Sequence, residues 1–152
     1  MGGFATKVGS EFEASMSQVA ATMGMSAEEV ANGCEAFKML EDAAKQAGAT
    51  TMFSASQSAE ALNYLALAGY TAEEACTALP KVLNLAAAGG LDLAYASDLV
   101  TDSMSALGLE MDELDSFMDK MAKTAQKSNT SVKLIFLPTI NRAKSVKSKN
   151  SN

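Results

Sequence analysis

Apolar residues recur every three or four positions along most of the chain, a spacing that places them on one face of an α-helix. The pattern predicts helices over residues 4–23, 26–47, 54–68, 92–107 and 111–126, with a further helical stretch between residues 71 and 88. The chain is therefore predicted to be all-α, with five to seven helices in an antiparallel bundle or an extended helical array.

The same spacing identifies the side chains that should face a core. In the first helix they are Phe4, Val8, Phe12, Met16, Val19 and Met23. In the next two they are Val30, Cys34, Phe37, Leu40 and Ala44, then Ala59, Leu62, Leu65 and Ala66. In the last two they are Leu93, Ala96, Val100, Met104 and Leu107, then Leu114, Phe117, Met118, Met121 and Ala125.

Helix starts and stops are marked by short local motifs. Three of them match the capping box, in which a Ser or Thr and a Glu or Gln three residues later satisfy each other's backbone N–H groups. These pairs are Ser26–Glu29, Ser54–Gln57 and Thr71–Glu74, and Asp92 is a further expected cap. The expected stops are Gly24, Gly48, Gly69, Gly89–Gly90 and Gly108. Pro80 should either kink its helix or separate a short helix from a new one over residues 80–88.

The charge is unevenly distributed along the 152 residues. Residues 1–132 carry 18 acidic residues and 7 lysines, a net of −11, whereas residues 133–152 carry four lysines and one arginine, a net of +5. An acidic body does not attract phosphate backbones, so nucleic-acid binding by residues 1–132 is not expected. We expect a helical domain over residues 1–132 and a basic, largely disordered tail over residues 133–152.

The residues that most enzymes require are missing. The chain has no His, which excludes Ser-His-Asp and Cys-His catalysis and most zinc sites. Asp98 and Asp102 lie one helical turn apart, but no neighbouring ligand completes a site, so a solvated face is expected. Cys34 and Cys76 are expected to be buried, reduced thiols, and a disulfide requires that their helices pack together. We predict no catalytic, cofactor or metal site and no enzymatic activity.

Several short motifs follow one another between Thr51 and Leu109. They are FSASQSAEA (53–61), LALAGY (65–70), LPKVLNLA (79–86) and AGGLDL (88–93), the last followed by ASD (96–98). In this order and spacing they resemble the core region of phage tail tape-measure proteins, with weaker similarity reaching back to Phe37 and forward to Thr130.

The resemblance implies structural work in a phage tail. Tape-measure proteins are long helical chains around which the tail tube polymerises, so tail-tube and tail-assembly chaperone proteins are the implied partners, and a homo-oligomer is a further option. The implied location is the virion tail, or the bacterial host cytoplasm during assembly. Because 152 residues span only about 230 Å even as one continuous helix, the hypothesis is a truncated or prophage-derived tape-measure product.

An alternative function rests on the end of the chain. The apolar run Leu134–Leu137 adjoins the basic residues of the tail, a combination typical of segments that bind membrane surfaces. The alternative is a small non-enzymatic helical protein that binds a membrane surface or a partner helix. No apolar run reaches the length of about 20 residues that a transmembrane helix needs.

Overall fold

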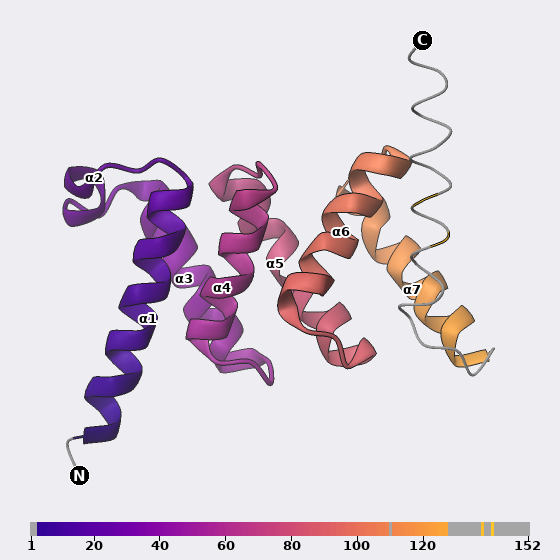
Figure 1. Ribbon diagram of the computed structural model, residues 1–152, viewed down its shortest axis with the longest axis horizontal. Coiled ribbons are helices and arrows are strands. Elements are labelled where there is room, and N and C mark those ends of the chain that lie inside the picture. The colour runs from indigo at the N-terminus through magenta and orange to yellow at the C-terminus, as the bar shows by residue number, and fades with distance from the viewer. Residues whose placement is uncertain (1–2, 110, 128–137, 139–140, 142–152) are drawn as a thin grey trace. The chain divides into compact units, whose positions relative to one another are not determined.

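The computed structural model describes residues 3–109, 111–127, 138 and 141. Within them it contains seven helices and no strand, which confirms the all-α prediction (Figure 1). The helices are α1 (Gly3–Thr22), α2 (Ala27–Ala31), α3 (Glu35–Thr50), α4 (Ala55–Leu67), α5 (Ala72–Gly89), α6 (Leu93–Leu107) and α7 (Met111–Lys127). Four of the five predicted helices, and the helical stretch predicted between residues 71 and 88, match an observed helix to within one or two residues at each end.

The chain divides into two compact units, Met1–Leu83 and Asn84–Asn152. In the first unit α4 packs against both α1 and α3, and Figure 1 shows these helices side by side. The stripes predicted for them supply the core of this unit. Its fully buried large side chains are Met16, Val19, Leu40, Leu62 and Leu65, joined by Leu79, Val82 and Leu83 from the first part of α5.

The second unit contains the end of α5 together with α6 and α7, and α6 packs against α7. Its buried apolar side chains include Leu99 and Val100 of α6 and Leu114 and Met118 of α7. Two hydroxyls of α6 are also buried, and each is satisfied within the helix. Ser97 donates to the Leu93 carbonyl at 2.8 Å, and Ser103 donates to the Leu99 carbonyl at 2.6 Å.

The three predicted capping boxes are all confirmed. In each box the backbone N–H of the Ser or Thr donates to the side chain three residues later, and the return bond closes the box. The forward distances are 2.7 Å for Ser26–Glu29, 2.8 Å for Ser54–Gln57 and 2.9 Å for Thr71–Glu74, and the return distances are 3.2, 3.1 and 3.3 Å. Asp92 caps α6 as expected, accepting from the Tyr95 N–H at 2.9 Å.

One junction recurs between the helices. A glycine with positive φ ends a helix, and the N–H of the next, apolar residue donates to the carbonyl five residues earlier, as in the Schellman motif. At Gly24 (φ 73°) the donor is Met25 and the acceptor Ala20, and at Gly69 (φ 91°) they are Tyr70 and Leu65. The same bond follows Gly90 and Gly108. Since a capping residue comes directly after the apolar one at three of these junctions, one helix stops and the next starts within four residues.

The helix predicted over residues 26–47 is wrong in one respect, because it is interrupted after one turn. Asn32 is the C-cap of α2, Gly33 takes a φ of 60°, and Cys34 becomes the N-cap of α3. The Cys34 N–H donates to the Glu29 carbonyl at 3.0 Å, which completes another Schellman-type end. The Asn-Gly pair is a turn signal that outweighs the apolar spacing of Val30, Cys34 and Phe37.

The prediction that Gly48 ends a helix is also wrong. Gly48 lies inside α3, which continues to Thr50 with Thr51 as its C-cap. The reason for a glycine here is close packing, because a Cβ at position 48 would lie 2.5 Å from the backbone nitrogen of Ala55. The missing side chain allows the end of α3 to approach the start of α4.

Pro80 does not separate two helices, so the alternative of a new helix starting there is wrong. α5 continues through it from Ala72 to Gly89. The proline itself is exposed, while Ala78, Leu79 and Val82 around it are buried. Burial of this apolar stripe offsets the backbone hydrogen bond that the proline cannot donate.

Most predicted core positions are buried or half-buried. Val30, Cys34, Phe37, Leu93, Met104 and Leu107 are among the half-buried ones. The side chains of Phe4, Val8, Met121 and Ala125 are outside the part of the chain that the structure describes, as are residues 133–152 apart from Pro138 and Asn141. The division into a domain over residues 1–132 and a basic tail therefore stays a prediction.

Candidate functional site

Candidate chemistry on the described residues is sparse. No group of three or more His, Cys, Asp or Glu side chains among them is arranged to hold a metal ion. Asp98 is exposed and Asp102 is half-buried on α6. The absence of catalytic, cofactor and metal sites stays a prediction from the sequence.

The two cysteines are free thiols, but neither is fully buried, which corrects the expectation of buried core residues. Cys34 lies at the start of α3 and makes no side-chain capping bond. The Cys76 thiol donates to the Met39 carbonyl at 3.6 Å, which connects α5 to α3 within the first unit. Burial raises the pKa of the Cys76 thiol. A raised thiol pKa lowers the thiolate fraction, so Cys76 is poorly suited to nucleophilic chemistry.

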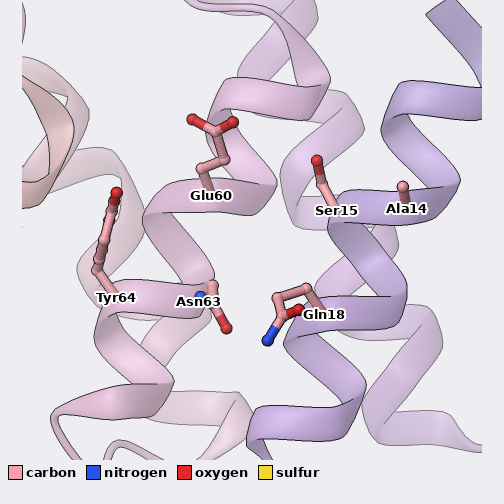
Figure 2. Close-up of a pocket in the computed structure, with 6 residues that line it drawn as sticks. All are labelled: Ala14, Ser15, Gln18, Glu60, Asn63 and Tyr64. Carbon is pink, nitrogen blue, oxygen red and sulfur yellow. The ribbon is translucent and has the colours of Figure 1, made fainter.

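A hollow of about 270 Å³ lies between α1 and α4 in the first unit. Figure 2 shows its side chains projecting from the two helices, with the amides of Gln18 and Asn63 facing each other across it. The lining residues are Ala14, Ser15 and Gln18 of α1, and Glu60, Asn63 and Tyr64 of α4. The positions on each helix are three or four residues apart or adjacent, so each set lies on one face.

Internal hydrogen bonds orient two of these side chains. Thr22 donates to the amide oxygen of Asn63 at 2.6 Å, a bond that joins α1 to α4 at one end of the hollow. Ser15 donates its hydroxyl proton to the Glu11 carbonyl at 3.0 Å. The carboxylate of Glu60 forms no ion pair with any residue in the described part of the chain. The sequence patterns pointed to none of these residues, because they come together only when α1 packs on α4.

Another contact holds α3 to α1. The Lys45 ammonium lies 2.7 Å from a carboxylate oxygen of Glu41 and 5.6 Å from the centre of the Phe12 ring. This distance is within the range of a cation–π interaction. Lys45 therefore acts in packing and is not among the residues that line the hollow.

Few large apolar side chains are exposed within the described residues. Met52, in the connection between α3 and α4, is 77% exposed, and Leu67 at the end of α4 is 66% exposed. Single exposed apolar residues are normal on protein surfaces. No helix in the described ranges is both long enough and apolar enough to cross a bilayer. The Leu134–Leu137 run and the basic residues that support the membrane-surface alternative lie outside the described residues.

Comparisons with known proteins point to one family. Residues 41–141 match the family described as "Phage-related minor tail protein". The chain is also 38% identical over 123 residues to a "Tape measure protein" of Pneumococcus phage Dp-1. That alignment covers 81% of this chain and 10% of the relative, so the chain spans about a tenth of the relative's length. No solved structure matches the chain. The resemblance seen in residues 51–109 is thereby confirmed.

Proposed function

The chain belongs to the phage-related minor tail protein family, and from this premise we propose that it is a structural component of a phage tail. The observation that carries the proposal is the 38% identity to a tape-measure protein over 81% of the chain. We assign the chain to the virion tail, assembled in the host cytoplasm, with tail-tube and tail-assembly chaperone proteins as its partners. The absence of His from the whole chain suits a role in assembly and not in catalysis.

The fold of the first unit bears on how such a chain would measure length. An unbroken helix of 123 residues would span about 185 Å. Among the described residues the longest helix, α1, has 20 residues, which corresponds to about 30 Å. Because α4 packs on both α1 and α3, residue count does not convert to length at the rate of a single helix. We propose that this segment contributes a folded surface for assembly, and that it lengthens only if these contacts open.

Mass spectrometry of purified particles tests the tail assignment. Particles are produced from the phage or prophage that encodes the sequence, heads and tails are separated, and peptides from residues 41–127 are quantified in each fraction. We expect these peptides in the tail fraction, at a constant ratio to the tail-tube protein across preparations. Their absence from particles, or equal amounts in heads and tails, would contradict the proposal.

A duplication tests the contribution to length separately. A second copy of residues 41–127 is inserted in frame, and tail length is measured by electron microscopy. A fully extended helix of these 87 residues adds about 130 Å. We expect a smaller increase, because α3 packs on α4 and α6 packs on α7 within the segment. An increase of the full 130 Å would overturn the folded-segment proposal and leave the tail assignment in place.

A further inference from the structure

Two successive pairs of helices, α4–α5 and α6–α7, share one register of caps, buried positions and stops. We propose that they are two copies of a single helical repeat of about 38 residues, which the chain can gain or lose as a module. Each pair consists of a capped helix, a glycine stop and a second helix of 18 or 17 residues. Pairs of helices of about this length are the building blocks of several classes of repeat protein.

The first helices of the two pairs match position by position. Ser54 caps α4 by accepting from the N–H three residues later, and Asp92, 38 residues further on, caps α6 in the same way. When residues 53–67 are aligned with residues 91–105, both side chains are buried, both half-buried or both exposed at 14 of the 15 pairs. All five buried positions coincide, and they are Ser58, Ala59, Ala61, Leu62 and Leu65 in α4 and Ala96, Ser97, Leu99, Val100 and Ser103 in α6.

The stop and the second helix continue the match, with one residue inserted. Gly69 and Gly108 lie 39 residues apart, both have positive φ, and after each the next N–H donates to the carbonyl five residues earlier. Ala78 is buried whereas Phe117, 39 residues later, is half-buried. Two buried positions of the second helices are 39 residues apart as well, Ala75 with Leu114 and Leu79 with Met118.

Helix α1 shows that amphipathic helices of this chain do not match in general. It also precedes a glycine with positive φ, Gly24, which is followed by the same type of hydrogen bond. When Gly24 is aligned with Gly69, residues 16–22 fall on residues 61–67, and only two of the seven pairs share the same burial. The same seven positions of α4 agree with residues 99–105 of α6 throughout. The agreement is therefore specific to α4 and α6.

Residue identity does not reveal the repeat. None of the 15 aligned pairs between residues 53–67 and 91–105 is identical. Leu62 corresponds to Val100, for example, so a buried aliphatic position is kept while the side chain changes. Cores tolerate such exchanges as long as volume and patterning are maintained, so the pattern of burial can persist after the identities have diverged.

The packing of α4 indicates what a copy of the repeat does. In the first unit α4 packs on both α1 and α3. In repeat proteins each copy packs mainly on its neighbours, so a helix with the stripe of α6 in the register of α4 should occupy the same place on α1 and α3. If the chain works in a phage tail, as proposed above, the repeat is the unit by which its folded segment can be lengthened or shortened. Whether the repeat exists can be tested by folding alone, without the tail assignment.

A deletion of residues 61–98, which removes 38 residues, tests the register directly. Glu60 is then followed by Leu99, and the hybrid helix carries Val100 in the buried position of Leu62. We expect this variant to keep the circular dichroism signal per residue of the wild type, a cooperative urea transition and slow hydrogen exchange of the α1 and α3 amides. The reason is that the hybrid helix replaces α4 and α7 replaces α5.

Two deletions of nearly the same size are the matched controls. Removing residues 61–96 or residues 61–100 shifts the following residues by two positions, which is about 200° around the helix axis. These deletions place Asp98 or Asp102, respectively, in the buried position of Leu62. Because burying an unpaired carboxylate is costly, we expect both controls to lose the cooperative transition and the slow exchange of α1 and α3.

A further variant separates the whole repeat from its first helix. It combines the deletion of residues 61–98 with the removal of residues 108–152, so that the hybrid helix remains and α7 is absent. We expect faster exchange of the α3 amides than in the deletion that retains α7. Equal exchange in the two variants would mean that the apolar stripe alone matters, and would overturn the repeat.

Insertions provide a second test, which stays decisive if the deletion leaves too small a core. A second copy of residues 61–98 is inserted after Asp98, and the controls duplicate residues 61–96 or residues 61–100 in the same way. We expect the in-register insertion to keep the signal per residue and the cooperative transition, and the two controls to lose stability. The proposal is overturned if the in-register variants are no more stable than their out-of-register controls in both series.

Discussion

Replacing Gly48 with alanine tests whether close packing between α3 and α4 holds the first unit together. Gly48 is helical, so alanine is favoured there by about 0.8–1.0 kcal/mol on helix propensity alone. The new Cβ, however, would lie 2.5 Å from the nitrogen, 2.8 Å from the Cα and 3.0 Å from the Cβ of Ala55. Two of these atoms belong to the backbone at the start of α4, which its capping box holds in place.

The magnitude follows from the two opposing effects. Overpacking of a well-packed contact costs about 1–3 kcal/mol, and an approach this close to backbone atoms belongs in the upper half of that range. After the gain in helix propensity, Gly48→Ala should lower the free energy of unfolding by about 1–2 kcal/mol. Gly9→Ala is the matched control, because Gly9 is helical in α1 and a Cβ added there would have no neighbouring atom within 4 Å. That variant should be stabilised by up to about 1 kcal/mol.

The assay is urea unfolding followed by circular dichroism at 222 nm, with hydrogen exchange of the α3 and α4 amides as a measure specific to the first unit. We expect the wild type to lie between the two variants in stability. If Gly48→Ala is as stable as Gly9→Ala, the close approach of Ala55 does not constrain the fold and the reasoning is refuted.

Three further predictions concern pH, packing and thiol chemistry. Hydrogen bonds from the capping boxes lower the pKa of Glu29 and of Glu74 in the folded state. The stability that these two carboxylates add is therefore present above their pKa in the unfolded chain, and it is lost as the pH falls through their lower pKa in the folded protein. NMR between pH 6 and pH 3 should therefore show that the capping hydrogen bonds at the starts of α2 and α5 weaken. The capping box of α4 has glutamine in place of glutamate and should not change. Equal weakening of all three boxes would contradict this. Leu62→Ala should lower the free energy of unfolding in urea by about 2–5 kcal/mol, because the Leu62 side chain is fully buried. Leu67 is exposed, so Leu67→Ala should change that free energy by less than about 0.5 kcal/mol. Similar values for the two variants would contradict the assignment of Leu62 to the core. In a variant whose other cysteine is serine, Cys76 should react with a disulfide reagent at pH 8 more slowly than glutathione does, and a faster reaction would show that burial does not raise its pKa.

The helix boundaries that the sequence predicted correctly are those encoded within four to six neighbouring residues. The capping boxes starting at Ser26, Ser54 and Thr71 depend on one side chain and the backbone three residues away. Gly108 likewise ends α6 in the left-handed conformation through bonds within its own helix. These interactions form wherever the local residues allow them, so they can be identified without knowing how the helices pack.

Other features were decided only by tertiary packing, since they depend on which helices meet. Gly48 has the sequence properties of a helix end, yet it lies inside α3, where its missing side chain makes room for Ala55 at the start of α4. Pro80 has the properties of a helix breaker, yet burial of the stripe around it keeps α5 continuous. The hollow between α1 and α4 brings Gln18 and Asn63 together from positions 45 residues apart in the chain, and no local pattern records that pairing. The sequence by itself thus determined where most helices begin and end, while the packing of helix on helix decided which distant side chains lie together.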